Sequence, residues 1–208
     1  RHAYTVTDKE TSEELLIDNE YIMSPKDLCT IDLLNQVVES GATILKIEGR
    51  GKGPEYVYTV TKIYKEALRA LENKTYTKEK IERWKKELET VYNRGFWEGY
   101  YLGRKLGEWT ADPGSAATEK KIYVGKGRKY FSKIKVGEFI IESGSLKTGD
   151  HLLITSPEFG IIKETVKELM VNGTVSSEAV KGDLVTLACE RKISAKDKLY
   201  KLVKTSNA

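Results

Sequence analysis

The stretch Thr43–Pro54, Thr-Ile-Leu-Lys-Ile-Glu-Gly-Arg-Gly-Lys-Gly-Pro, decides the fold that we predict for this chain. Apolar and charged residues alternate along its first half, and a period of two is typical of a β-strand. Helical patterns flank it, which predicts a helix–strand–helix unit of a parallel sheet that is covered on both faces. Lys46 and Glu48 would then point inward, where charges are costly unless they are paired or used. In barrels of parallel strands, charges at the carboxyl end of a strand are typically site residues.

The glycine-rich turn that follows this strand is typical of an anion site. Glycine lets the backbone approach a ligand closely, and Gly53-Pro54 suits the start of a helix, whose free N–H groups attract phosphate or carboxylate. The alternative is an ordinary loop with solvated basic residues. The candidate catalytic residues are Lys46, Glu48 and Arg50, and the candidate cofactor-binding residues of this turn are Gly49, Gly51 and Lys52.

Composition places the chain among folded proteins of one large or two small domains. It has 208 residues, of which 39% are hydrophobic and 32% charged, and no apolar run approaches the roughly 20 residues of a membrane span. The sequence shows no signal peptide, and Cys29 and Cys189 form no metal motif by themselves, which predicts a cytoplasmic protein without a membrane partner. Because the sequence does not begin with Met, we interpret it as a fragment or a processed chain.

The positive charge is concentrated in the C-terminal part. Residues 119–208 contain 17 Lys and Arg against 11 Asp and Glu, a net charge of +6, whereas residues 1–118 carry −2. A basic module indicates a nucleic-acid partner. A merely solvated basic surface is the alternative.

Periodicity and turn signals predict the elements of the N-terminal part. They are a hairpin of strands 3–7 and 14–18, a short strand 21–23, a helix from Ser24 to Gly41 with Ser24 as its N-cap, the strand 43–48, a helix from Pro54 to about Asn73, and a third helix 77–92. Next comes the segment Tyr92–Tyr101, which places several aromatic residues around Arg94. These residues could stack on rings while Arg94 holds an anion, which makes Arg94 a fourth cofactor-binding candidate. Alternatively, the aromatic residues form a plug that closes the barrel.

The C-terminal part changes character after a small-residue linker. Short alternating segments are separated by glycine turns, and this pattern is typical of a small closed barrel. The predicted strands are 121–124, 129–136, 139–141, 151–154, 161–169, 183–188 and 199–203. The turns resemble those of the second-domain β-barrel of translation elongation factors, a module that contacts RNA or protein.

Three ordered motifs of this sequence are similar to those of a known family. They are Met23–Asp32, Leu45–Arg50 with Pro54–Val57, and Asn93–Phe96, and they resemble the collagenase-like peptidases, family thirty-two of unknown catalytic type. The resemblance covers residues 20–103 closely. It implies an α/β plus all-β chain: the C-terminal part of a modified TIM barrel at residues 1–106, a linker at 107–119, and a C-terminal β-barrel domain at 120–208.

The same resemblance implies cofactors and partners. Family branches hydroxylate a tRNA wobble uridine, a ribosomal RNA cytidine or ubiquinone precursors, and prephenate is the implied source of the hydroxyl group in the tRNA branch. Cys29 matches a family cysteine, so an iron–sulfur cluster or zinc would be held by Cys29 and cysteines upstream of Arg1. The implied partners are the upstream half of the barrel and tRNA or rRNA. A partial barrel exposes strand edges, so we expect this chain to need that half, another partner or a homo-oligomer; a monodisperse, cooperatively unfolding monomer would contradict this.

Three functions remain open from the sequence. The first is an RNA hydroxylation factor acting on the tRNA wobble uridine. The second is a peptidase, although the sequence contains no Ser-His-Asp order and no His-Glu-x-x-His motif, and its only histidines are His2 and His151. The third is a non-catalytic binding module.

Overall fold

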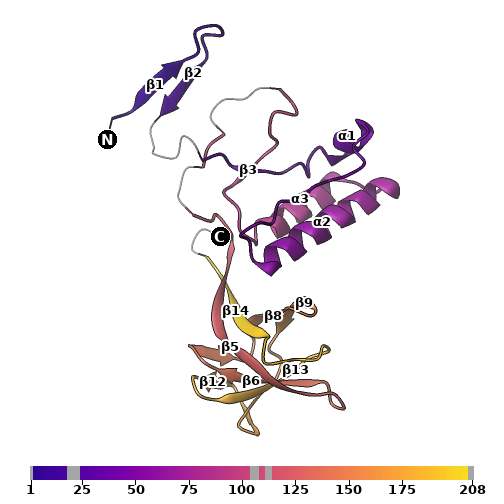
Figure 1. Cartoon of the computed structure of the whole chain (residues 1–208), viewed down its shortest axis with the longest axis vertical. Helices are drawn as coiled ribbons and strands as arrows, with labels where there is room; N and C mark the ends of the chain where they lie inside the picture. The colour runs from indigo at the N-terminus through magenta and orange to yellow at the C-terminus, as the bar shows by residue number, and fades with distance from the viewer. Residues whose placement is uncertain (1, 18–23, 104–107, 111–113, 206–208) are drawn as a thin grey trace. The chain divides into compact units, whose positions relative to one another are not determined.

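The computed structural model describes residues 2–17, 24–103, 108–110 and 114–205. The chain divides into two compact units (Figure 1). The first unit comprises Arg1–Glu48 and Thr59–Ala117, and the second comprises Gly49–Tyr58 and Thr118–Ala208. The predicted strand 21–23 and part of the predicted linker, residues 107 and 111–113, lie outside the described residues.

The first unit begins with the predicted hairpin. Strands β1 (Tyr4–Thr7) and β2 (Glu14–Ile17) pair antiparallel, with Tyr4 opposite Ile17. Asp8 stabilises the turn, because its carboxylate accepts hydrogen bonds from the backbone N–H groups of Glu10 and Thr11 at 2.9 and 3.0 Å. The hairpin prediction is therefore confirmed.

The predicted helix from Ser24 is wrong over most of its length. Residues Asp27–Leu28 form strand β3, which pairs in parallel with β4 (Phe96–Trp97), and helix α1 covers only Leu34–Glu39. The backbone N–H groups of Lys26, Asp27 and Cys29 donate to carbonyls of distant segments, so they cannot take part in a helix. Long-range pairing has overridden a local capping signal. Gly41, with a φ of 92°, follows α1 as predicted.

The predicted buried strand Thr43–Glu48 is also wrong. These residues form no strand, and Lys46 and Glu48 are exposed instead of pointing inward. A strand needs a neighbour for its N–H and C=O groups, and none of the described residues provides one here. The alternation itself is real, because Leu45 and Ile47 are half-buried while Ile44 is 86% exposed. Parallel pairing among the described residues is confined to β3 and β4, so the TIM-barrel part stays a prediction.

Two helices form the body of the first unit, as the apolar spacing predicts. Helix α2 (Pro54–Glu72) begins at the predicted Pro54, and the carbonyl of Gly53 accepts from the N–H of Tyr56 at 3.1 Å. Helix α3 (Lys78–Leu88) has Thr77 as its N-cap. The two helices contribute half of the buried apolar residues of this unit, which are Cys29, Ile31, Leu33, Leu34, Val60, Ile63, Ala67, Ala70, Trp84, Leu88, Val91 and Ala117. No helix of the described residues is long and apolar enough to cross a membrane.

The second unit is built on an eight-stranded sheet. Its order is β11-β10-β13-β6-β5-β14-β8-β9, and every neighbouring pair is antiparallel. The strands are β5 (Glu119–Phe131), β6 (Val136–Ile141), β8 (His151–Ser156), β9 (Gly160–Thr165), β10 (Leu169–Val171), β11 (Thr174–Ser176), β13 (Leu184–Ala188) and β14 (Lys198–Lys204). Strands β7 (Ser145–Lys147) and β12 (Glu178–Val180) form a separate antiparallel pair.

Most predicted strands of this unit are confirmed, with two corrections. The predicted strand 129–136 is a hairpin, because β5 ends at Phe131 and Lys135 in the turn has a φ of 51°. The predicted strand 161–169 is divided into β9 and β10 around buried Val166. Strands β7, β11 and β12 were missed because three residues are too few to show a period.

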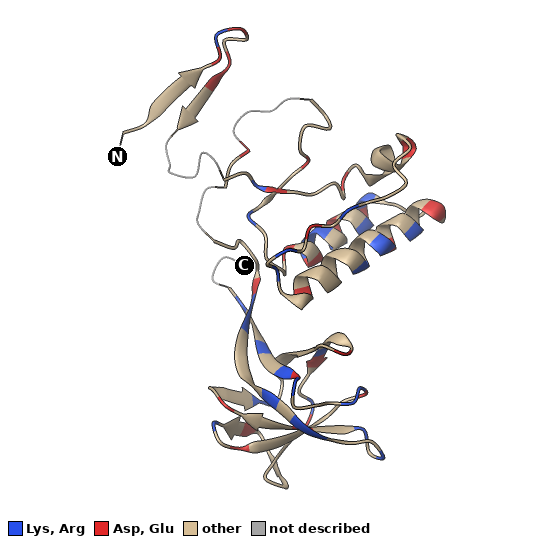
Figure 2. Ribbon diagram, in the orientation of Figure 1, with Lys and Arg blue, Asp and Glu red and all other residues tan. Residues whose placement is uncertain are grey.

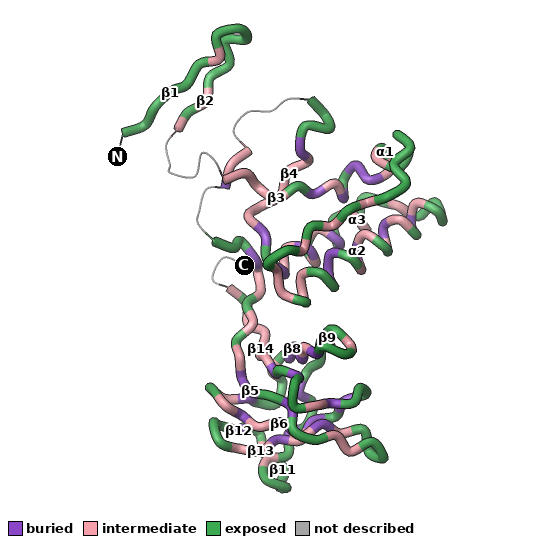
Figure 3. Tube along the Cα trace, in the orientation of Figure 1, coloured by how far each residue is buried: buried purple, intermediate pink, exposed green. Residues whose placement is uncertain are grey.

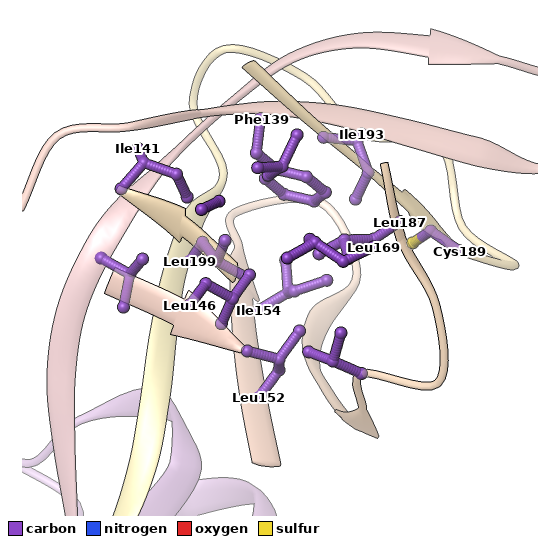
Figure 4. Close-up of a cluster of buried hydrophobic side chains, with 14 residues drawn as sticks. Phe139, Ile141, Leu146, Leu152, Ile154, Leu169, Leu187, Cys189, Ile193 and Leu199 are labelled. Atoms are coloured by element: carbon purple, nitrogen blue, oxygen red, sulfur yellow. The ribbon is translucent and has the colours of Figure 1, made fainter. Parts of the chain in front are cut away.

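Alternating residues of these strands form one apolar core (Figure 4). Phe139, Ile141, Leu146, Leu169 and Leu199 are completely buried in it. Figure 3 shows buried residues alternating with exposed ones along the same strands. The core therefore follows from the period of two that the sequence shows.

Two glycines of β5 allow the backbone to be approached closely. A Cβ atom on Gly125 would lie 2.0 Å from the carbonyl oxygen of Ile140, and one on Gly127 would lie 2.2 Å from that of Ser194. Neither contact can be relieved by rotating a side chain, because both oxygens belong to the backbone.

We expect Gly125→Ala to destabilise the second unit by about 1–3 kcal/mol, because β5 and β6 would have to separate. Gly144→Ala is the matched control: nothing lies within 4 Å of its Cβ position and only its φ of 64° is unfavourable, so it should cost less. Urea unfolding followed by circular dichroism measures both. All three tryptophans lie in the first unit, so their fluorescence reports whether that unit is unaffected. Equal losses of stability in the two variants would contradict the prediction.

Candidate functional site

An ion pair joins two of the three motifs. The guanidinium of Arg94 donates to Oδ1 of Asp27 from Nη2 at 2.9 Å and from Nε at 3.2 Å, and the backbone N–H of Arg94 donates to Oδ2 at 3.0 Å. The hydrogen bonds to Asp27 raise the pKa of Arg94. The sequence predicted that Arg94 could hold an anion, and in the structure that anion is the carboxylate of Asp27. The pair joins β3, which contains Asp27, to the segment that precedes β4.

Cys29 lies next to this pair along the chain and is 7% exposed. Its N–H donates to the carbonyl of Trp97, and the hydroxyl of Tyr64 lies 3.9 Å from its Sγ atom. Burial raises the pKa of the Cys29 thiol, and burial likewise raises the pKa of Tyr64. The thiol is therefore held in its neutral form at neutral pH.

The surroundings of Cys29 do not fit a metal by themselves. A cysteine ligand binds as the thiolate, and structural zinc takes four ligands. Within the described ranges, no group of three His, Cys, Asp or Glu residues could hold a metal ion. The metal prediction for Cys29 therefore stays a prediction, in which further ligands come from elsewhere.

The candidate catalytic residues Lys46 and Glu48 belong to the first unit and are exposed. Lys46 and Glu48 each come directly after a half-buried residue, Leu45 and Ile47. Their backbone is therefore partly anchored, while their side chains are exposed to solvent. Exposed charges can bind or orient a charged ligand.

The glycine turn belongs to the second unit. Gly51 has a φ of 72°, a conformation that favours glycine, and the N–H of Lys52 donates to the carbonyl of Gly49 at 3.0 Å. The ammonium of Lys52 lies 5.9 Å from the centre of the Tyr56 ring. Arg50 is exposed. The tight turn that the sequence predicted is present, and its role in binding an anion stays a prediction.

The aromatic segment is only partly buried. The rings of Trp97 and Tyr100 meet edge to face with 5.1 Å between their centres, while Tyr100 and Tyr101 are 62% and 63% exposed. Both exposed rings belong to the segment Tyr92–Tyr101, which also contains Arg94.

With this geometry described, comparisons with known proteins identify the family. A model described as peptidase family U32 matches residues 1–111. The chain belongs to this family. It is 52% identical over 204 residues to a protein named collagenase from Porphyromonas gingivalis, covering 98% of this chain and 49% of that protein. It is also 38% identical over 85 residues to tRNA hydroxylation protein P2 of Bacillus subtilis, covering 39% of this chain and 28% of that protein.

This U32 chain spans about half the length of the collagenases that it matches. The C-terminal domain of a U32 peptidase from Geobacillus thermoleovorans is 14% identical, with a TM-score of 0.36, covering 38% of this chain and 90% of that domain.

Sequence reasoning missed the role of Asp27 and the contact of Tyr64 with Cys29. Asp27 falls within the helix that the sequence predicts from Ser24 to Gly41, whereas its partner Arg94 lies 67 positions later. The signal that could have revealed the pair was the resemblance itself, because Asp27 and Arg94 occur in two motifs of one family. Opposite charges in two ordered motifs are candidates for an ion pair.

We expect Asp27→Ala to destabilise the first unit by about 1 kcal/mol, because Arg94 would lose three hydrogen bonds while remaining partly solvated. Side chains of this pair are 26% and 35% exposed. The matched control is Glu190→Ala, which removes an ion pair with Lys135 whose side chains are 73% and 62% exposed; it should not change stability measurably. Urea unfolding followed by tryptophan fluorescence measures the first variant, and circular dichroism measures the control. No loss of stability in Asp27→Ala would show that the pair is not structural.

Burial of Cys29 predicts how stability depends on pH. An ordinary thiol has a pKa of 9.0, and that of folded Cys29 is higher. The unfolded chain therefore loses this proton first as the pH rises, so the stabilisation is complete below pH 9 and is lost above it. Cys29→Ala should flatten the decrease in the free energy of unfolding of the first unit between about pH 8 and pH 10. Cys189→Ala, a buried cysteine in the second unit, should leave that decrease unchanged; an unaltered slope in Cys29→Ala would be the contrary result.

Proposed function

We propose that the full-length protein is an RNA hydroxylation factor that acts on the tRNA wobble uridine. The observation that carries this proposal is the net charge of +6 on residues 119–208, in a chain whose family includes a tRNA hydroxylation protein. A protein that binds RNA needs positively charged side chains to contact the negatively charged phosphate backbone. A peptidase has no such general requirement.

In this proposal, the segment around Thr43–Pro54 is the reaction site. The upstream half of the protein would complete a TIM barrel, with the exposed Lys46 and Glu48 at its mouth. There they orient the substrate or move protons. Arg50, Lys52 and the N–H groups of Gly49 and Gly51 bind the carboxylates of a small cofactor such as prephenate. An iron–sulfur cluster or zinc on Cys29 would require cysteines from that upstream half, and no step is assigned to it.

Peptide hydrolysis is the second candidate, and one observation favours it. The collagenase from Porphyromonas gingivalis matches both units of this chain, whereas the match to the tRNA hydroxylation protein covers 39% of it. The sequence contains no Ser-His-Asp order, no His-Glu-x-x-His motif and no paired-aspartate signature. A peptidase site would therefore be assembled from residues of the upstream half or be of a new kind.

The first experiment is mass spectrometry of tRNA and rRNA nucleosides from a strain that lacks the full-length gene. Loss of a hydroxylated uridine, restored by the wild-type gene, is the expected result. Glu48→Gln and Arg50→Ala should fail to restore it. Arg69→Ala, which removes an exposed cation from α2, is the matched control and should restore it fully.

Each other outcome selects a different function. Restoration by Glu48→Gln and Arg50→Ala would mean that this chain is a binding module and not part of the reaction site. An unchanged nucleoside profile, together with degradation of gelatin by the purified full-length protein, would replace the proposal with a peptidase.

A further inference from the structure

We propose that one edge of the second unit is the surface that docks RNA through its phosphate backbone. The basic edge consists of eight exposed cations from the β5–β6 hairpin, from the loop before β14 and from the first residue of β14: Arg128, Lys129, Lys133, Lys135, Arg191, Lys192, Lys196 and Lys198. This inference rests on the proposed function for the choice of RNA, and on the structure for the location.

The basic edge accounts for the whole excess of positive charge in this part of the chain. Residues 128–135 and 189–198 contain eight Lys and Arg against two acids, Glu190 and Asp197. The other residues of 119–208 contain nine Lys and Arg against nine Asp and Glu, so they are electrically balanced. If the positive charge served solubility alone, it would not need to be concentrated in two short segments.

Direct contacts hold the two segments together. The N–H of Cys189 donates to the carbonyl of Lys135 at 2.8 Å, and the hydroxyl of Tyr130 donates to the carbonyl of Cys189 at 3.0 Å. At the other end of the loop, the N–H of Gly127 donates to the carbonyl of Asp197 at 2.9 Å. The loop therefore crosses the hairpin and is fixed to it at both ends, which makes the eight cations members of one surface. Figure 2 shows the blue segments of both on the same side of this unit.

These cations are not neutralised within the structure. Among the described residues, Lys135 is the one member that forms an ion pair, with Glu190 at 2.7 Å. Five other lysines of residues 119–208 do form ion pairs: Lys121, Lys126, Lys147, Lys163 and Lys201. Asp197 is completely buried, and its Oδ2 accepts from the N–H of Ser194 at 2.7 Å, so it fixes the loop. Seven of the eight cations of the basic edge thus form no ion pair within the described residues, whereas five of the nine cations elsewhere in residues 119–208 do.

Two details of strand pairing affect the cations at the start of the basic edge. Lys198 lies directly opposite Lys126 across β14 and β5, an arrangement that is unfavourable by itself. The register of β5 against β6 shifts between Gly127 and Lys129, so Arg128 has no partner across the ladder. Bulges of this kind turn a side chain away from the regular alternation. Glu142 already pairs with Lys126 at 2.7 Å, so an anionic partner would complement Lys198 and Arg128 and not Lys126.

RNA fits this surface better than a flat anionic partner does. The cations occur on a strand, a turn and a separate loop, so they follow a folded edge and not a plane. The ring of Phe131, with the ammonium of Lys129 5.0 Å from its centre, adds a half-buried aromatic residue among them. Phosphate contacts position a nucleic acid without reading its sequence, and a basic edge beside an aromatic ring is suited to that role.

The test measures binding of an unmodified tRNA transcript to the full-length protein over a range of salt concentrations. The triple variant Arg128→Gln, Lys133→Gln, Lys192→Gln should raise Kd about tenfold at ~0.1 M salt. It should also reduce the slope of log K against log salt by about two, because each lost phosphate contact removes 0.7 to 0.9 of that slope.

The matched control removes the same charge from elsewhere in the unit. Lys120→Gln, Lys181→Gln, Lys204→Gln replaces three exposed lysines that lie outside the basic edge. It should change Kd by less than about twofold, because the lost charges do not touch the RNA. Circular dichroism of both triple variants checks that the second unit remains folded.

The outcomes separate this inference from the proposed function. Equal weakening by the two triple variants, or by neither, would overturn the basic edge even if the strain experiment shows a lost hydroxylated nucleoside. A specific effect of the first triple variant would support the edge even if no nucleoside changes. If the protein bound vesicles of equal parts phosphatidylcholine and phosphatidylserine but did not bind tRNA, the partner of the basic edge would be an anionic membrane and not RNA.

Discussion

The close approach of three backbone segments at β5 is the constraint on which the second unit depends. β5 pairs with β14 on one side and with β6 on the other, and the loop before β14 crosses it at Gly127. There is no room for a side chain at Gly125 or Gly127. Because the crossing is tight, Ile193 of the loop reaches the apolar core beside Phe139, and the cations of the loop lie beside those of the hairpin. The same contacts thus form the core and gather the charge.

The first unit depends on a different kind of interaction. Its α2 and α3 helices form an ordinary apolar core, but the segments that carry the family motifs are held by polar contacts, including the pair of Asp27 with Arg94. Such contacts are directional, so they fix β3 against β4 over only two residues. Cys29, which follows β3, is buried, and the half-buried Tyr64 lies beside it. Asp27 and Arg94 hold two family motifs of this unit together, while Lys46 and Glu48 are exposed.

The segment Thr43–Glu48 illustrates how a correct pattern led to a wrong element. Its alternation is reproduced in the burial of Leu45 and Ile47 against the exposure of Ile44. Alternation, however, reports which side chains face an apolar surface and not whether a neighbouring strand is present. The helix predicted from Ser24 failed for a related reason. Ser-Pro followed by an acid is a good local cap, but the pairing of β3 with β4 and the bonds from Arg94 to Asp27 outweigh one capping interaction.

The sequence by itself determined the helices α2 and α3, the N-terminal hairpin, most strands of the second unit and the family, since each is encoded in a period or in an ordered motif of neighbouring residues. The tertiary structure alone decided the pairing of β3 with β4, the partner of Arg94, the exposure of Lys46 and Glu48, and the joining of residues 128–135 to 189–198. The physical reason is that periodicity records burial within one element, whereas these features join segments tens of residues apart. The long-range contacts among them are hydrogen bonds and ion pairs, and no periodic pattern in the sequence indicates which two residues will meet.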